Sequence, residues 1–574
     1  MNALIRFRSR LAVASGLLLS AAYPGGSQGQ PAIPPPYGTN IHLTEKDFVG
    51  LRSFRSQDRI VGTYYFYWYS TETGEHIRNG DGSDALTDHP ARMEGFSYRS
   101  VAWHKQQLQD MIAAGIDVVL PVFWGAPSEQ AAKTELHWSY VGLEQLVKAR
   151  DELLREGKSP PLIGLFYDTS TLQHNAWRQH IDLTTDYGKQ WFYATVRDFF
   201  SVVPLRHWAM LEGKPIVLLY AAAFAKNHDQ GFIDFTRREF ARDFGGCTPW
   251  IAAEVSWQVR AESKVAWGGA LGLRNPGVAS LGPGYDHSAV PGREPLIVKR
   301  ENGAFYSRNW EKFLRRPSHF VMVETWNEFH EGTDVAESKE YGRKYIEETR
   351  LYADRFKQGW KPSWPAGPFR GARSVEAILG ANSQERGLSL VDNEDGRTVP
   401  ATAGGRPCRA IKPVPKLGRY VYFAVDDSFK SAEACAFVLE VEYFDSAAGT
   451  LSVEFDGNQS EAPFSGAYSK AAETVTLRGE KTWKTARFYL RGAQFLNSQN
   501  GNADLRLVVT GPEFMVRRVA LEVERPKVET EVRKKAEVRH PKFEQGNQHY
   551  SAAGGAGNSS SVGSLKTCQT AEES

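Results

Sequence analysis

The chain has 574 residues, more than one ordinary domain needs, so we expect two domains with further segments at the ends. Hydrophobic residues make up 41% of the chain and aromatic residues 12%, which is enough to build sizeable cores. The formal net charge is +2, and Lys and Arg are spread along the chain, which argues against a nucleic-acid partner. The four cysteines, Cys247, Cys408, Cys435 and Cys568, exclude a disulfide scaffold and lack the spacing of metal ligands. A disulfide between Cys408 and Cys435 is left open.

The N-terminus has the order of charge and hydrophobicity that is typical of a secretory signal. Three arginines precede an apolar run from Leu11 to Ala22, and small and polar residues follow. The run is too short to span a bilayer comfortably. We therefore expect a signal peptide over residues 1–28 and a secreted or periplasmic protein without stable membrane insertion, with an uncleaved signal or a lipid as the alternative. Residues 29–58, rich in Pro and Gly at their start, are expected to form a linker.

Residues 59–362 contain short apolar runs that alternate with stretches of helical periodicity. The runs predicted as strands are residues 61–69, 117–125, 161–168, 214–220, 249–255, 264–269, 277–284 and 319–326. The predicted helices are residues 102–115, 139–156, 190–200, 232–244 and 337–356. Uninterrupted apolar strands that alternate with helices indicate a parallel sheet covered by helices. About eight strands, with no Gly-rich dinucleotide motif after the first, favour a closed (β/α)8 TIM barrel over an open doubly wound sheet.

Residues 372–525 have a different pattern, because apolar and polar residues alternate with period two between turn signals. Segments such as "GRYVYFAVDD" and "AFVLEVEYFD" predict an all-β sandwich, or a jelly roll. Residues 526–574 are first charged and then rich in Gly and Ser, so we expect a disordered tail.

In a (β/α)8 barrel the active site lies at the C-terminal ends of the strands. The residues at these positions combine aromatic rings, which stack on sugars, with carboxylates, which act on glycosidic bonds. For Asp168, an N-cap role in the next helix explains the residue equally well. The residues predicted to bind substrate are Tyr67, Trp68, Trp124, Asp168, Glu254, Tyr285, Asp286, Trp326, Asn327 and His330.

The stretch "VETWNEFHEGT" places Glu328 and Glu331 three residues apart directly after the last predicted strand. Hydrolysis of an acetal needs a protonated acid at the leaving oxygen and a second carboxylate near the anomeric carbon. Two carboxylates this close cannot both ionise freely, so the pair supplies an acid and a base. We predict that both are catalytic. The alternative is that they favour a helix N-terminus and face water.

Four motifs, "YYFYWY", "AAGIDVVLPVFWG", "LGPGYD" and "NEFHEGT", carry a resemblance that spans Thr63 to Phe356. Here the chain resembles glycoside hydrolase family 99 and related secreted barrels. The resemblance implies an endo-acting, retaining hydrolysis of the α-mannosidase type. It implies that Glu328 draws the proton from the sugar's 2-hydroxyl, which attacks the anomeric carbon, and that Glu331 is the general acid and then the base. By pattern and position, the β-rich region is similar to sugar-binding modules of secreted hydrolases.

The sequence as a whole predicts an exported, monomeric glycoside hydrolase whose substrate is a polysaccharide or glycan. No organic cofactor or catalytic metal is expected, because the carboxylates supply the proton transfers. A calcium ion in the β-rich region and an ordinary turn explain a group of oxygen-bearing side chains equally well: Asn497, Asn500, Asn502 and Asp504. Two alternatives are a barrel that binds carbohydrate without turnover and a glycosyltransferase-like relative. The export signal argues against the second, because nucleotide-sugar donors are cytoplasmic.

Overall fold

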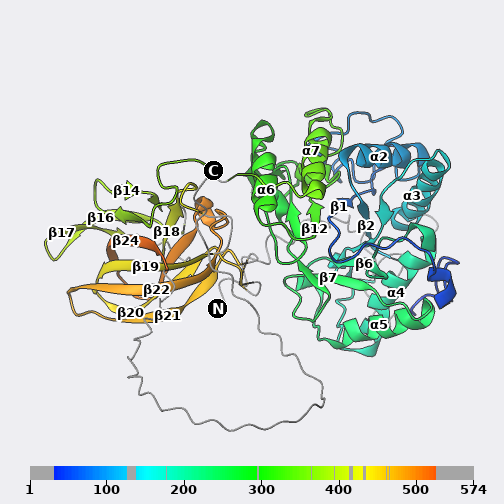
Figure 1. Cartoon of the computed structure of the whole chain (residues 1–574). Coiled ribbons are helices and arrows are strands. Elements are labelled where there is room, and N and C mark those ends of the chain that lie inside the picture. Colours follow the sequence, from blue (N-terminus) through cyan, green and yellow to red (C-terminus); the bar gives the residue numbers. More distant parts are fainter. Residues whose placement is uncertain are drawn as a thin grey trace, which may run out of the picture. The chain divides into compact units, whose positions relative to one another are not determined.

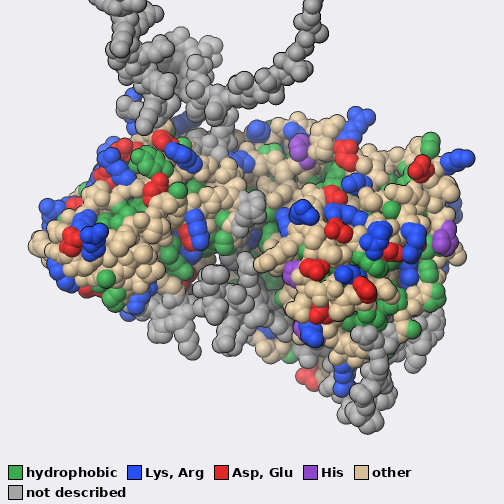
Figure 2. Space-filling model, turned by 90° about the horizontal axis from the view of Figure 1, so that it is seen from below, with side chains coloured by type: hydrophobic (Ala, Val, Ile, Leu, Met, Phe, Trp, Pro, Cys, Tyr) green, Lys and Arg blue, Asp and Glu red, His purple; other side chains and the backbone are tan. Residues whose placement is uncertain are grey.

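The computed structural model describes residues 32–125, 137–175, 177–293, 296–363, 365–392, 395–412, 418–430, 435–459, 462–463 and 466–524. The predicted signal peptide and C-terminal tail lie outside these residues. Across the described ranges, no helix is both long enough and apolar enough to cross a membrane. On the face that Figure 2 shows, Lys and Arg side chains are interspersed with Asp and Glu.

The first domain contains a parallel sheet in the order β8-β7-β6-β4-β2-β1-β12-β9 (Figure 1). A backbone hydrogen bond of 2.9 Å from Val278 N to Lys264 O joins the segments at the two ends of this order. The sheet therefore closes into the predicted (β/α)8 barrel. Its strands are β1 (Ile60–Tyr65), β2 (Val118–Phe123), β4 (Leu165–Tyr167), β6 (Lys214–Leu219), β7 (Trp250–Glu254), β8 (Ser263–Val265), β9 (Ala279–Leu281) and β12 (Phe320–Val323). Short strands β3 (Leu162–Ile163) and β5 (Met210–Leu211) pair with β2 and β6.

Both faces of the barrel strands are buried, which explains their continuous apolar runs. All six residues of β1 and all six of β2 are buried. Gly62 of β1 is needed for space, because an added Cβ atom would lie 2.6 Å from the sulfur of Met322 in β12. The neighbouring strands thus pack too closely at this point for any larger residue.

Six helices surround the described part of the barrel in Figure 1. They are α2 (Val101–Ala114), α3 (Trp138–Arg155), α4 (Asp186–Val202), α5 (Gly231–Asp243), α6 (Ala304–Arg315) and α7 (Lys344–Gln358). Helix α2 is bounded as its sequence indicates, since Ser100 accepts a hydrogen bond from Trp103 N and Gly115 adopts a φ of 77°. The connections from β7 to β8 and from β8 to β9 contain no α-helix, so the described part of the barrel has fewer α-helices than strands.

Two helices differ from the sequence-based expectation. Helix α6 was not among the predicted helices, although Tyr306, Trp310, Phe313 and Leu314 give it a buried face. Helix α7 begins at Lys344 rather than at residue 337. The preceding residues form a turn in which Gly342 N donates to Ser338 O and Gly342 has a φ of 56°. That left-handed residue prevents an earlier helix start.

The second domain, residues 374–523, is an antiparallel β-sandwich, as predicted. One sheet contains β13 (Ser374–Ile378), β14 (Gln384–Arg386), β16 (Thr398–Ala403), β17 (Arg406–Ile411), β19 (Cys435–Phe444), β22 (Trp483–Ala493) and β24 (Met515–Val523). The other contains β15 (Leu388–Val391), β18 (Tyr420–Val425), β20 (Ala448–Phe455), β21 (Ser469–Arg478) and β23 (Leu505–Val509). Their inward-facing residues form a core of their own.

The structure bears on the possible disulfide and on the possible calcium site of the sandwich. Among the described cysteines, Cys408 of β17 is a buried free thiol, and β24 lies between β17 and β19. The side chain of Cys435 lies outside the described residues. The ammonium group of Lys430 lies 2.9 Å from Asn497 Oδ1 and 3.1 Å from Asp504 Oδ2. Both oxygens therefore face a side-chain cation, which favours the turn explanation over a calcium site.

Candidate active site at the strand ends

The segment after β12 folds into a closed turn at the C-terminal end of the barrel. Trp326 N donates to Tyr64 O over 2.9 Å, and Thr325 N donates to Thr333 O over 3.0 Å. Gly332 completes the turn with a φ of 53°. These bonds tie both ends of the segment to the barrel. They hold the short 3-10 helix η9 (Phe329–Glu331), which carries the glutamate pair.

Glu328 lies at the start of η9 and is only 4% exposed. Its carboxylate caps η9 by accepting a hydrogen bond of 3.2 Å from His330 N. It also lies 2.6 Å from His330 Nδ1. Burial lowers the pKa of His330, but the charge and hydrogen bond of Glu328 raise it more, so the net shift is upward. Glu328 does cap a helix, but it is buried against an imidazole instead of facing water.

Glu331 lies at the other end of η9 in a different environment. Its carboxylate is 3.1 Å from Arg293 Nη1, and the hydroxyl group of Tyr285 also donates to it. Burial and the nearby charge of Glu328 raise the pKa of Glu331 more than Arg293 and Tyr285 lower it. Glu331 therefore keeps its proton to a higher pH than an ordinary glutamate.

The hairpin of β10 (Tyr285–Asp286) and β11 (Ile297–Val298) brings Tyr285 and Arg293 to Glu331. Asp286 is half-buried, and its carboxylate accepts a hydrogen bond of 2.8 Å from Ser288 N within the hairpin. The hairpin thus supplies direct partners of Glu331 from a segment between β9 and β12.

Tyr220, directly after β6, lies near several carboxylates. Its pKa is raised well above the usual range by burial and by the negative charges of Glu331, Asp168, Glu254 and Glu324. Those carboxylates come from the ends of β4, β7 and β12 and from η9. The site therefore has a strongly acidic centre beside a half-buried tyrosine.

Asp168 and Glu254 are both buried and each has a partner. Asp168 accepts a hydrogen bond of 2.7 Å from Trp124 Nε1 and one of 3.1 Å from Ser170 N, so it caps the short helix η4 (Thr169–Leu172) and also anchors an indole ring. Burial raises its pKa. Glu254 accepts a hydrogen bond of 2.8 Å from Ser256 N.

Glu324 is a buried acid that the sequence did not single out, because it lies inside a predicted strand. It accepts hydrogen bonds from Gly268 N at 2.9 Å, Gly269 N at 3.0 Å and Ser280 Oγ at 2.7 Å. Burial nevertheless raises its pKa to about 7. Glu324 links β12 to the connection between β8 and β9, at the start of the 3-10 helix η7 (Gly269–Leu271).

An aromatic cluster lies beside the glutamate pair. The rings of Trp68 and His76 are stacked with centroids 4.7 Å apart, and Trp68 lies 6.1 Å from Trp124 and 5.9 Å from His330. Among the residues that the structure describes, Trp68 Nε1 is buried without a hydrogen-bond partner. Burial lowers the pKa of His76 to about 3, so this ring stays neutral. The cluster also contains Trp138, which the sequence did not single out.

The other predicted residues are buried within the first domain, where Tyr67 contacts helix α3 and Trp326 contacts helix α2. Tyr67 and Trp326 are fully buried, and their polar atoms already donate hydrogen bonds within the domain. Asn327 accepts a hydrogen bond of 2.8 Å from Phe66 N and donates one of 2.6 Å to Phe66 O. Their geometry holds the segment after β12 against β1 and leaves no polar atom of Asn327's side chain directed at a substrate.

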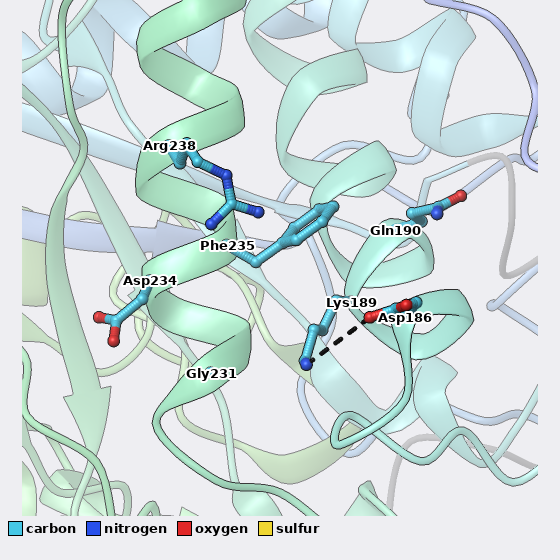
Figure 3. A pocket seen from close by; sticks show the side chains of 7 residues that line it. All are labelled: Asp186, Lys189, Gln190, Gly231, Asp234, Phe235 and Arg238. Atoms are coloured by element: carbon cyan, nitrogen blue, oxygen red, sulfur yellow. Dashed lines mark ion pairs between the residues drawn. The ribbon is translucent and has the colours of Figure 1, made fainter.

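A shallow groove of about 510 Å³ lies between α4 and α5 (Figure 3). Charged and polar side chains line it, including Lys189, whose ammonium group is 3.9 Å from Asp186. No lining residue belongs to the strand ends, so we place the candidate site at the barrel mouth instead. In the described part of the chain, no group of three or more His, Cys, Asp or Glu side chains could hold a metal ion.

Comparisons with known proteins give the following similarities. A family model described as "Domain of unknown function (DUF5010)" matches residues 49–366, and no curated protein matches the chain. A solved GH99 endo-α-mannosidase from Bacteroides thetaiotaomicron is 14% identical with a TM-score of 0.38, over 52% of this chain and 97% of that one. A solved glycoside hydrolase-like protein is 15% identical with a TM-score of 0.36, over 56% and 99%. The C-terminal CBM6 module of a laminarinase from Zobellia galactanivorans is 9% identical with a TM-score of 0.16, over 26% and 98%.

Proposed function

The chain belongs to the DUF5010 family through residues 49–366, and we propose that this domain is an exported glycoside hydrolase that cleaves a polysaccharide or glycan. The observation that carries the proposal is the unequal glutamate pair on η9. Glu328 is paired with His330, whereas burial and the charge of Glu328 keep the proton on Glu331. Cleavage of a glycosidic bond needs one carboxylate and one carboxylic acid in the same place.

In the proposed reaction Glu331 donates its proton to the leaving oxygen of the scissile bond. Glu328 accepts a proton from the sugar hydroxyl beside the anomeric carbon, and that hydroxyl oxygen attacks the carbon from the opposite face. Water then attacks the anomeric carbon with Glu331 as the base, the bond from that carbon to the 2-oxygen breaks, and Glu328 returns its proton to the 2-oxygen. The bond is thus cleaved with retention of configuration. The resemblance of "NEFHEGT" to family 99 supports this order of steps and an endo mode of cleavage.

The β-sandwich is proposed to bind carbohydrate and to hold the enzyme on its substrate. Two observations support this proposal. Residues 374–523 have a hydrophobic core of their own, and they follow directly after the barrel in the sequence. Export is proposed from the charge and hydrophobicity of residues 1–28.

The test is the release of reducing ends from a panel of α-mannans, α-glucans and other polysaccharides. The variants are Glu328→Gln and Glu331→Gln, with Glu347→Gln, an exposed residue of α7, as the matched control. We expect the wild type to cleave one polymer. The cleavage rate should fall by about several hundred-fold or more in both site variants and stay normal in the control. Sugar binding without any cleavage would instead support the carbohydrate-binding alternative. Cleavage that survives both site substitutions would overturn the proposed roles.

A further inference from the structure

Behind Glu331 a chain of hydrogen bonds runs through the hairpin of β10 and β11. Leu296 N donates to His287 Nε2 over 3.0 Å. His287 Nδ1 lies 3.0 Å from the Tyr285 hydroxyl oxygen, and that hydroxyl in turn contacts Glu331. His287 is only 9% exposed. The chain ends at a backbone amide, which can act only as a donor.

The backbone amide determines where His287 carries its proton. Because Leu296 N–H donates, Nε2 must be unprotonated, and the ring of a neutral histidine then carries its hydrogen on Nδ1. Nδ1–H therefore donates to the Tyr285 oxygen. Tyr285 is left to donate its own hydrogen to Glu331. Arg293 Nη1 is 3.5 Å from Nδ1, a longer contact than the 3.0 Å to Tyr285, so it does not reverse this order.

We propose that His287 is a positioning residue that fixes the direction of the Tyr285 hydrogen bond, so that Tyr285 stabilises Glu331 whenever Glu331 becomes a carboxylate. The inference rests on the proposed function, in which Glu331 loses its proton to the leaving group. A donor that is already aimed at the site of developing charge needs no reorganisation during the reaction. In this arrangement His287 acts on Glu331 through Tyr285.

Several other charged or titratable groups face Glu331: Glu328 and His330 on η9, Arg293 on the hairpin, and Tyr220 after β6. Arg293 also donates to the carboxylate directly. A useful test must therefore change the Tyr285 contact without changing these groups.

Two amide substitutions separate the two nitrogen atoms of His287. The side-chain nitrogen of Asn reaches the position of Nδ1, so His287→Asn retains a donor for Tyr285. The longer Gln reaches the position of Nε2, so His287→Gln retains only the acceptor for Leu296 N. Tyr285→Phe removes the hydroxyl group and therefore shows the full effect of losing the hydrogen bond from Tyr285 to Glu331. All are made in the whole protein.

The measurement is the pH profile of kcat/KM on the polysaccharide that the wild type cleaves. Loss of the donor raises the pKa of Glu331, so His287→Gln and Tyr285→Phe should move the basic limb upward by about 0.5 to 1 pH unit. We expect kcat to fall about three- to tenfold, less than after loss of a group that contacts the reacting atoms. His287→Asn should stay close to the wild type. The double variant Tyr285→Phe/His287→Gln should show no shift beyond that of Tyr285→Phe alone.

Equal pH profiles for the Asn and Gln variants, or additive shifts in the double variant, would overturn the inference. A second measurement does not depend on activity. In ¹⁵N-labelled wild type, the His287 signals, assigned with His287→Asn, should show the proton on Nδ1, and ¹³C titration of Glu331 should move upward in His287→Gln. If the wild type cleaves no glycan, the proposed function fails, but these spectra still test whether His287 fixes the direction of the Tyr285 hydrogen bond. A proton on Nε2, or a Glu331 titration that does not move in His287→Gln, would disprove this role of His287.

Discussion

At the scale of single residues, the acidic side chains at the barrel mouth differ because their partners differ. Glu328 lies against His330, Glu331 against Arg293 and Tyr285, and Glu324 against backbone amides. The same chemical group therefore pairs with an imidazole at Glu328 and has a raised pKa at Glu331 and Glu324. Spacing in the sequence indicates that two of these residues lie together. It does not show which of them keeps its proton.

Glu324 gives a prediction about stability and pH. Burial raises its pKa from 4.5 to about 7, so the fold favours the protonated form. Its stabilising contribution is complete below the unfolded pKa and is lost as the pH rises through the folded pKa. Glu324→Gln cannot ionise. The free energy of unfolding of the variant should therefore improve relative to the wild type by up to about 3 kcal/mol between about pH 5 and pH 8.

Chemical unfolding at a series of pH values measures this difference. The absolute stability of Glu324→Gln is expected to be lower at acidic pH, because its amide nitrogen meets donors such as Gly269 N. The change with pH is the informative quantity. Glu347→Gln, which is exposed, should follow the wild type at every pH. Parallel curves for Glu324→Gln and the wild type would show that Glu324 titrates at its ordinary pKa.

Some residues at the mouth could not be predicted from the sequence. Arg293 lies within a hairpin that no strand pattern indicates, and His76 lies in a loop far along the chain from η9. Only the tertiary fold brings them to Glu331 and Trp68. Glu324 was missed for a different reason, because it lies within the predicted strand 319–326 and not after its end. Tyr220 was recognisable as a strand-end residue, but its central position was not.

At the scale of elements, the segment after β12 is held by a buried charge network. Arg300 donates to Asp88 at 2.9 Å, to Asp334 at 2.8 Å and to Gly332 O at 3.0 Å. The guanidinium group also lies over the Tyr341 ring at 4.2 Å. The network ties the loop before α2 to the residues that follow η9. It therefore fixes the position of Glu331 from outside the candidate site.

Arg300→Met tests this network. Removal of one partner leaves Asp88 and Asp334 buried without their cation, which costs about 3 to 5 kcal/mol of unfolding free energy. The matched control is Arg308→Met, because Arg308 forms an exposed ion pair with Glu301 and its loss should leave the free energy of unfolding close to that of the wild type. Urea unfolding measures both values, and the variant that remains folded is then assayed for cleavage. Equal stability of the two variants would show that the network is not stabilising.

The elements themselves were predictable where one physical cause dominates. The barrel strands were found because burial on both faces makes them continuously apolar. Helix α6 was missed although its buried residues have helical spacing, since charged residues dilute the pattern in "AFYSRNWEKFLR". The start of α7 was placed too early, because a turn at Gly342 replaces the first two predicted turns of helix. The helical periodicity of the sequence extends across this boundary, so only the local backbone geometry determines where α7 begins.

At the scale of the whole molecule, the barrel and the β-sandwich have separate hydrophobic cores. The catalytic candidates Glu328 and Glu331 belong to the barrel alone. A module that binds the polymer raises the effective concentration of substrate without a new contact at the site. The two domains therefore should contribute to different kinetic quantities.

Deletion of residues 372–525 separates these contributions. For a short soluble oligosaccharide of the cleaved polymer, the remaining barrel should keep kcat/KM within about threefold of the full chain, because every group around Glu331 is retained. For the insoluble polymer, the rate at low enzyme concentration should fall by about ten- to hundredfold, because the substrate is no longer held nearby. Thermal unfolding of the shortened chain is the control that the barrel is intact. If the shortened chain is folded but equally impaired on both substrates, the sandwich contributes to the catalytic site itself. If it is as active as the full chain on both substrates, the sandwich does not bind the polymer.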